Sequence, residues 1–266
     1  MNPVSLTPPD LAVAASLVVL DAALSLILAL RLHRQIAIAA VRMTLQLIAI
    51  GYILRLVFKL NNPLATLAIV LVMVLIASRE VAARPEQRFK DLSNLALGAG
   101  SVSLATFVTA ILALTTAIRP QPWFDPRYAV PLAGIILGNV LNAASLTLDS
   151  LLSGAAKDRA GIEARLCLGA SYWQAMGGPI RSAIRRGLLP IINQMSAAGV
   201  VTLPGIMTGQ ILAGMDPLEA VKYQILLMFL LSGGSGLAAV AIAYLTAWRL
   251  TDPRQRLRLD RLKSAA

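Results

Sequence analysis

Polar side chains recur at regular spacing inside apolar runs of this sequence, where they could line a route through a membrane. Asn139, Asn142 and Asp149 fall close to one face of a helix. Amide and carboxylate oxygens suit harder metal ions, and methionine thioethers suit softer ones. We therefore interpret these three residues as part of a candidate transport path, which would suit a metal ion if that is the substrate. The further candidates are Asn193, Gln194, Met195, Met207 and Gln210.

An ordinary structural role is the alternative for each of these residues. Asparagines in helical bundles commonly hydrogen-bond to a neighbouring helix, and such a bond contributes less than about 2 kcal/mol. For any single residue both interpretations stay open, whereas the spacing of the whole group favours a path.

Charged and amide groups in the first two apolar runs favour a structural pair. If residues 10–31 and 37–58 form an antiparallel hairpin, Asp21 comes level with Gln46, and Arg42 lies one turn away. We expect Asp21 to pair with Arg42 as structural support rather than as a proton relay, because breaking a buried pair is costly whatever its function.

The sequence lacks the residues for a disulfide, a Cys/His metal cluster or a phosphate-binding loop. One cysteine, Cys167, and one histidine, His33, cannot form a disulfide or a Cys/His metal cluster within one chain. No G-x-x-x-x-G-K-[ST] motif occurs. No paired carboxylates or Ser/His arrangement indicates an enzyme. We expect no cofactor in this chain, so energy from ATP would have to come from another subunit.

Composition indicates which elements hold these residues. Of the 266 residues 57% are apolar and 14% charged, and the mean hydropathy is +0.72, whereas soluble domains are about 45–50% apolar. Apolar runs of about 20 residues cross a bilayer as helices, which predicts an all-α polytopic membrane protein with one transmembrane domain over 1–266. The expected spans are 10–31, 37–58, 63–83, 92–118, 127–151, 187–204 and 217–249.

The positive charges predict orientation. The net charge of +11 lies in short basic clusters between apolar runs, which indicates topology rather than a nucleic-acid surface. Of 24 Lys and Arg residues, 18 lie at or after the ends of the first, third, fifth and last spans, and 4 (Lys59, Arg119, Arg127 and Lys222) lie on the other side. This distribution places the N-terminus outside and the basic tail 250–266 in the cytoplasm.

Glycine and proline interrupt the last third of the chain. Residues 203–214 are apolar but too short and too broken to span a bilayer, so we expect a re-entrant or interfacial segment there. The last span carries Ser232-Gly233-Gly234-Ser235-Gly236, and we expect one long helix bent at that point.

Residues 152–186 form the longest predicted cytoplasmic connection, and we expect a short amphipathic helix over 157–172 within it. Ile162, Leu166 and Gly169 share one face. The residues Glu163, Ala164 and Gly169 resemble the Glu-Ala-Ala signature of the coupling helix in bacterial ABC importers, although Arg165 replaces the second alanine. A lipid-bound surface helix is the alternative.

Longer strings resemble the FetB family of iron-export ABC permeases, to which plant aluminium-tolerance permeases belong. The similarity is strongest over residues 130–230 and looser in the first four spans, where Arg42–Leu47 also fits. The strings are Leu137–Leu146, Ile162–Ala164 with Leu168–Ser171, Leu189–Met195 and Leu203–Gly214.

This resemblance implies a permease of the bacterial inner membrane that exports iron or a related metal ion. It implies two copies of this chain with two copies of an ATP-binding subunit, which would bind ATP and magnesium. The coupling residues would be Glu163, Ala164, Leu168 and Gly169. An ion-coupled secondary transporter or channel is the alternative, but the sequence has few intramembrane acids and no convincing repeat.

Overall fold

The computed structural model describes residues 7–60, 62–118 and 125–264. Residues 1–6, which the charge distribution assigns to the outside, and Arg119 lie outside the described residues. The chain, expected to form one transmembrane domain, divides by its internal contacts into two compact units. One comprises Met1–Asn61 with Leu212–Gly214, and the other comprises Asn62–Ile211 with Met215–Ala266.

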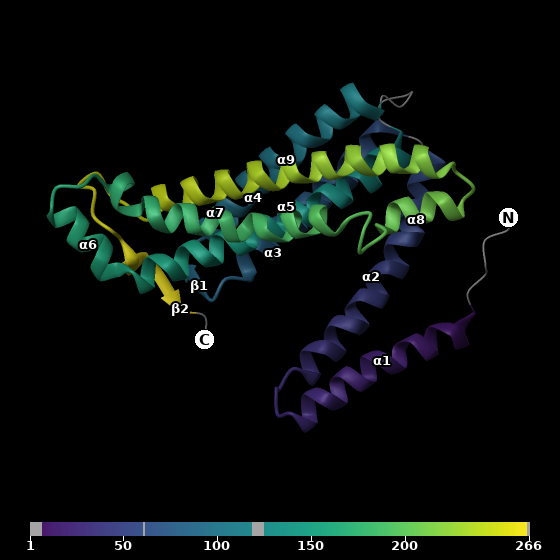
Figure 1. Ribbon diagram of the computed structural model, residues 1–266, viewed down its shortest axis with the longest axis horizontal. Helices are drawn as coiled ribbons and strands as arrows, with labels where there is room; N and C mark the ends of the chain where they lie inside the picture. The colour runs from purple at the N-terminus through teal and green to yellow at the C-terminus, as the bar shows by residue number, and fades with distance from the viewer. Residues whose placement is uncertain (1–6, 61, 119–124, 265–266) are drawn as a thin grey trace. The chain divides into compact units, whose positions relative to one another are not determined.

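The first unit is a helical hairpin formed by α1 (Pro8–Ile27) and α2 (His33–Leu60) (Figure 1). Thr7 is the N-cap of α1, and its backbone N–H donates to the Asp10 carboxylate at 2.8 Å, as in a capping box, while its hydroxyl donates to the same carboxylate at 2.6 Å. At the turn, the Ser25 hydroxyl accepts from the Leu32 N–H at 2.9 Å. Most apolar side chains of both helices are exposed, as expected where lipid surrounds them.

In the second unit, α5 (Pro126–Lys157) is central and contacts α3 (Pro63–Ala83), α4 (Ser93–Leu112), α7 (Tyr172–Ala197) and α9 (Pro217–Arg249). A π-helical turn, η1 (Ala113–Ile118), continues α4. The core of the unit runs along α5, where Ile136, Leu148, Leu151 and Leu152 are fully buried. The central helix therefore sets the positions of its four neighbours.

Small residues allow the helices of this unit to approach closely. A Cβ on Gly187 of α7 would clash with the Thr147 side chain and lie 2.8 Å from the Ala143 carbonyl of α5. A Cβ on Gly98 of α4 would lie 2.9 Å from the Ser78 carbonyl of α3. These contacts are typical of membrane bundles, in which small residues let backbones meet.

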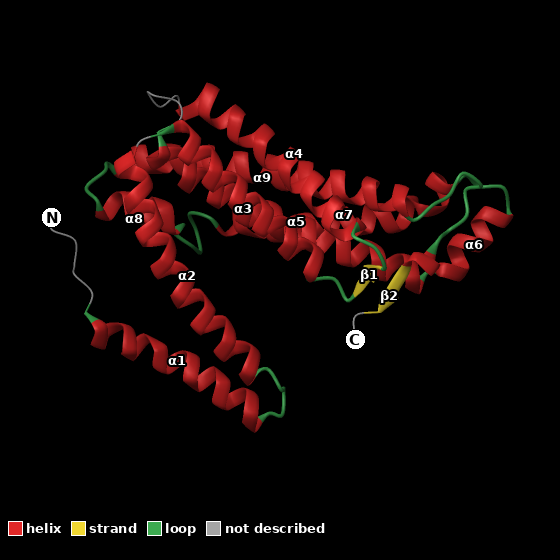
Figure 2. Cartoon of the chain, turned by 180° about the vertical axis from the view of Figure 1, so that it is seen from behind, coloured by secondary structure: helices red, strands yellow, loops and turns green. Residues whose placement is uncertain are grey.

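Two short helices, α6 (Arg159–Cys167) and α8 (Gly205–Leu212), join long helices, and the 3₁₀ turn η2 (Leu259–Arg261) lies in the tail after α9. Strand β1 (Gln87–Phe89) pairs antiparallel with β2 (Leu262–Ser264), with Phe89 opposite Leu262 (Figure 2). The basic tail is therefore folded against the connection between α3 and α4.

The all-α membrane class is confirmed. Within the described residues, six helices are long and apolar enough to cross a membrane: α1, α2, α3, α4 with the start of η1, α5 and α9. The chain is a polytopic helical membrane protein. The last expected span is a single helix, α9.

The sixth span has other bounds in the structure than the sequence predicts. Instead of 187–204, the helix α7 runs over Tyr172–Ala197, and most of the expected loop 152–186 is helical. Ser171 begins α7 with a capping box, because its N–H donates to the Gln174 side chain at 2.8 Å and its hydroxyl accepts from the Gln174 N–H. The sequence pattern indicates a loop here because it contains several arginines. In the structure these arginines lie on the exposed face of α7, and the opposite face of the same helix is buried.

Candidate coupling helix and transport path

The short helix α6 lies between α5 and α7 at one end of the second unit. The predicted apolar face is confirmed for Ile162, which is fully buried, and Leu166, which packs partly against the core. The helix is shorter than the predicted 157–172. Asp158 interrupts the helix on its N-terminal side, and Gly169 follows its end with φ +88°, a conformation that favours glycine.

Arg165 fixes α6 to its neighbours. Its guanidinium donates to the Asp158 carboxylate at 2.7 Å, to the Ala175 carbonyl of α7 at 2.8 Å and to the Gly161 carbonyl at 3.1 Å. In the sequence this residue was only a departure from the coupling signature. The sequence signal that could have indicated the Asp158–Arg165 pair is the spacing of seven residues, or two helical turns, between them.

Of the predicted coupling residues, Glu163 and Ala164 lie on α6, and Leu168 and Gly169 follow its end directly. Glu163 forms an ion pair with Arg159 at 2.8 Å, and the Arg159 and Glu163 side chains are 63% and 45% exposed. Ala164 and Gly169 are exposed, and the Leu168 side chain is 88% exposed. An exposed leucine beside an exposed glycine suits contact with a partner surface, because nothing in the unit covers it.

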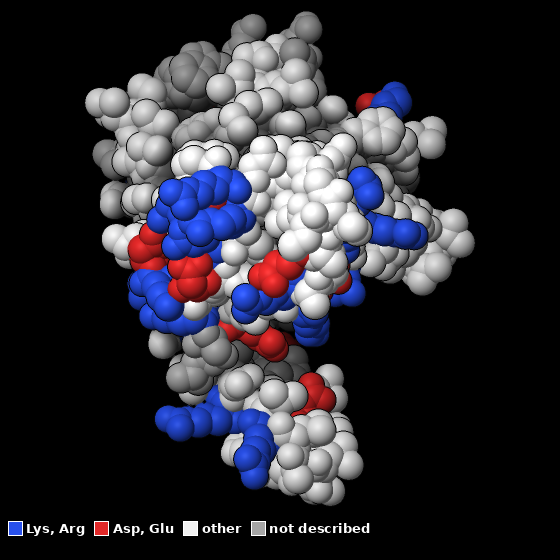
Figure 3. Space-filling model, turned by 90° about the vertical axis from the view of Figure 1, so that its left-hand side faces the viewer, with Lys and Arg blue, Asp and Glu red and all other residues white. Residues whose placement is uncertain are grey.

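A groove of about 860 Å³ adjoins α6. Glu163, Gly169 and Gln174 line one part of it, and Arg254 and Leu257 of the tail line another. Basic and acidic side chains gather at this end of the second unit (Figure 3). The tail thus contributes to the same surface as the predicted coupling residues.

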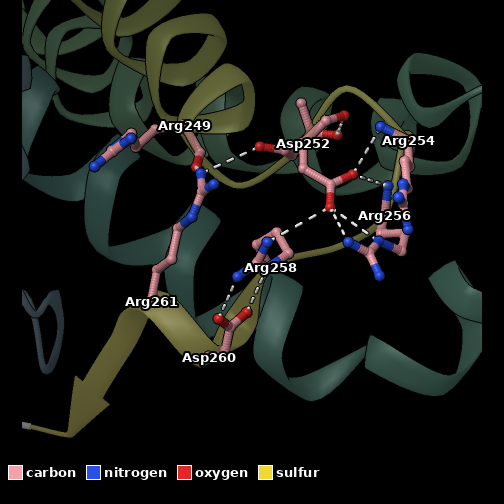
Figure 4. A network of polar contacts seen from close by, with 8 residues as sticks. Arg249, Asp252, Arg254, Arg256, Arg258, Asp260 and Arg261 are labelled. Atoms are coloured by element: carbon pink, nitrogen blue, oxygen red, sulfur yellow. Dashed lines mark hydrogen bonds and ion pairs between the residues drawn. The ribbon is translucent and has the colours of Figure 1, made fainter.

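Asp252 organises the tail (Figure 4). Its carboxylate accepts hydrogen bonds from the Arg256 side chain at 2.9 Å and from the backbone N–H groups of Arg254 and Arg256 at 2.9 and 3.1 Å. The Asp252 side chain is only 5% exposed. These hydrogen bonds, above all the one from the Arg256 side chain, lower the pKa of Asp252 to about 2.

Two hydrogen bonds join the tail and α9 to the start of α7. The Gln255 side-chain oxygen accepts from the Tyr172 N–H at 3.0 Å, and the buried Tyr172 hydroxyl donates to the Ala247 carbonyl at 2.7 Å. A glutamine carbonyl thereby satisfies one of the free N–H groups at a helix N-terminus. The sequence contained no local signal for this contact.

The polar residues of α5 bond to nearby backbone and side chains. The Asn139 amide donates to the Ile135 carbonyl at 3.1 Å, and the Asn142 oxygen accepts from Arg84 at 3.1 Å. Asp149 accepts from the Glu86 N–H at 3.1 Å. Asn142 and Asp149 therefore anchor the segment after α3 to α5, which supports the structural alternative for these two residues.

The methionines lie on other elements. Met195 of α7 and Met207 of α8 line an apolar cavity of about 550 Å³, together with Met228 and the buried Gln224 of α9. Asn193 and Gln194 are exposed, and Gln210 is partly buried with a side-chain oxygen that lacks a hydrogen-bond partner within the described part of the chain. The structure thus brings Met195 and Met207 to one cavity.

Comparison with known proteins identifies the family. The model of the Uncharacterised protein family UPF0014 matches residues 8–250. The chain belongs to UPF0014. The UPF0014 membrane protein slr1647 of Synechocystis is 43% identical over 216 residues, which are 80% of this chain and 82% of that protein.

Two further relatives carry names that describe a role. The Probable iron export permease protein FetB of Escherichia coli is 33% identical over 265 residues, 99% of each chain. The Arabidopsis thaliana protein ALUMINUM SENSITIVE 3 is 30% identical over 236 residues, 88% of this chain and 84% of that protein. No solved structure matches the chain.

The predicted pair in the hairpin of this UPF0014 protein stays a prediction. Asp21, Arg42 and Gln46 all have exposed side chains within α1 and α2. Among the described residues, no group of three His, Cys, Asp or Glu side chains could hold a metal ion, and Cys167 is an exposed free thiol.

Proposed function

We propose that this chain is the permease subunit of an ABC transporter that exports iron or a related metal ion across the bacterial inner membrane. A separate ATP-binding subunit would supply the energy, in a complex with two copies of each subunit. The similarity to the Escherichia coli permease over 99% of both chains carries this proposal.

The geometry of α6 supports a coupling role. Ile162 and Arg165 hold the helix on α5 and α7, while Glu163, Leu168 and Gly169 remain accessible on its outer side. A helix held rigidly by the permease and exposed toward a partner can transmit movement between two subunits.

The basic clusters support the proposed orientation. The tail, α6 and the β1–β2 pair lie toward the same end of the second unit (Figure 1). Cytoplasmic loops of membrane proteins carry an excess of Lys and Arg, so we assign this end to the cytoplasm.

Co-purification and transport test the proposal. The full-length chain, purified from its own membrane in mild detergent, should retain an ATP-binding subunit, and the reconstituted complex should hydrolyse ATP faster with iron and move iron into the compartment opposite that subunit. A chain that moves iron without any ATP-binding subunit, driven by an ion gradient, would contradict the proposal.

Leu168→Arg tests the coupling surface. Because the Leu168 side chain is 88% exposed, the change should leave folding intact but weaken retention of the ATP-binding subunit about tenfold or more, as expected for an apolar interface anchor. Val200→Arg is the matched control, since Val200 is 90% exposed in the turn after α7. If both variants retain the ATP-binding subunit equally well, α6 is not part of the interface with that subunit.

A further inference from the structure

A second cavity lies among the C-terminal end of α5, α6 and the first half of α7, with a volume of about 310 Å³. We propose that it binds a phosphate group, and that the phosphate belongs to the headgroup of an anionic lipid. This site is separate from the coupling surface and does not depend on the proposed function. The side chains that would bind the phosphate are Ser150, Ser153, Lys157, Arg165, Ser182 and Arg186.

The lining is strongly basic. Lys157, Arg165 and Arg186 carry three positive charges, and Asp158 is the one acidic residue in the lining. The Asp158 carboxylate accepts from Arg165 at 2.7 Å, so this pair largely neutralises itself. Lys157 and Arg186 form no ion pair within the part of the chain that the structure describes, which leaves two cations for an anionic ligand.

The serines supply unused hydroxyl groups. Elsewhere in the chain, Ser78, Ser101 and Ser196 donate to a backbone carbonyl four residues earlier, Ser196 on the same helix as Ser182. The hydroxyls of Ser150, Ser153 and Ser182 make no such bond to any described residue. Hydroxyl donors beside Lys and Arg suit the oxygens of a phosphate, which bind charged donors strongly.

Two glycines keep the cavity open. A Cβ on Gly154 would meet nothing within 4 Å, and a Cβ on Gly178 would meet only the Arg165 guanidinium, at 3.9 Å. A volume of about 310 Å³ is several times the roughly 30 Å³ that one water occupies in the liquid. A phosphate group with part of its attached headgroup therefore fits.

The surroundings favour lipid as the source of the phosphate. The cavity lies at the end of α5, a helix long and apolar enough to span a membrane. Its cations would lie at headgroup level, where basic pockets between helices bind anionic headgroups. Free inorganic phosphate offers the same oxygens without the acyl chains, and the test distinguishes the two.

Native mass spectrometry of the purified full-length chain measures binding directly. We expect dioleoyl-phosphatidylglycerol to bind in preference to dioleoyl-phosphatidylcholine, and the double variant Lys157→Gln/Arg186→Gln to weaken that binding. Each cation near an anionic headgroup contributes roughly fivefold, so the pair should contribute about 25-fold. The matched control is Arg181→Gln/Arg185→Gln, which removes two exposed cations of α7 that do not line the cavity.

The outcomes separate the sources and test the site. Selective binding of phosphatidylglycerol that only the first double variant weakens supports a lipid headgroup site. Binding of inorganic phosphate with the same variant pattern, without lipid preference, supports the phosphate site with a soluble ligand. Equal weakening by both double variants, or no binding of either probe, would overturn the proposal. Circular dichroism spectra that are unchanged in both double variants show that a loss of binding does not result from a loss of folding.

Discussion

Single side chains connect parts of this protein that are far apart in the sequence. Arg165 joins the end of α5 to α6 and α7, and Gln255 joins the tail to α7. Asp252 gathers the three arginines Arg254, Arg256 and Arg258 around one carboxylate that is 5% exposed. At this scale, the end of the second unit is ordered by charge-assisted hydrogen bonds, which are stronger than neutral ones.

Acidification should loosen the tail. The pKa of Asp252 is about 2 in the folded chain, below the roughly 3.9 of an unfolded aspartate, so its stabilising effect is complete above about pH 4 and is lost as the pH falls toward 2. Amide exchange in residues 252–262, corrected for the intrinsic effect of pH, should accelerate severalfold across this window. Asp252→Asn should show the faster exchange already at pH 7.

Asp260→Asn is the matched control for this prediction. Asp260 bonds to Arg258 and its pKa is also about 2, but its side chain is 59% exposed, and exposed ion pairs contribute little. Its exchange at pH 7 should stay close to that of the unmodified chain. If both variants exchange equally fast, Asp252 is not the organising residue of the tail.

The long helices of the second unit are held by close backbone contact around α5. Gly187 brings α7 against α5 at Ala143 and Thr147, and Gly98 brings α4 against α3. Lipid provides no hydrophobic drive between helices, so the fit between small residues contributes much of their association. The position of α6 depends on this contact, because α6 is connected to both α5 and α7.

Gly187→Ala should destabilise the α5–α7 contact by about 1–3 kcal/mol, as overpacking commonly does, because the new Cβ would clash with Thr147. Thermal unfolding in detergent measures the loss. Gly138→Ala on α5 is the control, since a Cβ there meets nothing within 4 Å and alanine favours a helix by up to about 1 kcal/mol. Similar melting of the two variants would show that α7 does not depend on this close approach.

At the scale of the whole molecule, apolar helices carry few polar side chains, and these lie in separate places. The polar residues of α5 bond near the end of α3, whereas Met195 and Met207 line the apolar cavity. In the proposed complex with two copies of the chain, a transport path would also involve the second copy. The predicted path over all eight residues therefore stays a proposal.

Cysteine accessibility tests this path in the complex, with the exposed Cys167 first replaced by serine. Cysteines at positions 139, 142, 149, 195 and 207 should react with a water-soluble thiol reagent in at least one of the nucleotide-free and nucleotide-trapped states. Leu148→Cys is the control, because Leu148 is fully buried and should stay unreactive. If positions 139, 142 and 149 stay unreactive in both states, the hydrogen bonds of α5 are structural and the path lies elsewhere.

The sequence by itself determined the membrane class, most of the long helices and the buried face of α6. Each of these depends on the length or period of a local apolar pattern, as with Ile162 and Leu166, which share one helix face. The sequence did not determine that α7 begins at Tyr172 and includes the basic residues up to Arg186, because exposed arginines occur both in cytoplasmic loops and on the exposed face of a helix.

Only the tertiary structure decided the partners of the polar groups. Asn142 meets Arg84 across 58 positions of the chain, and Tyr172 meets Gln255 across 83. The tail pairs as β2 with a strand that lies between α3 and α4. No local periodicity encodes such contacts, because they form only when the packing of α5 with its neighbours has brought distant segments together.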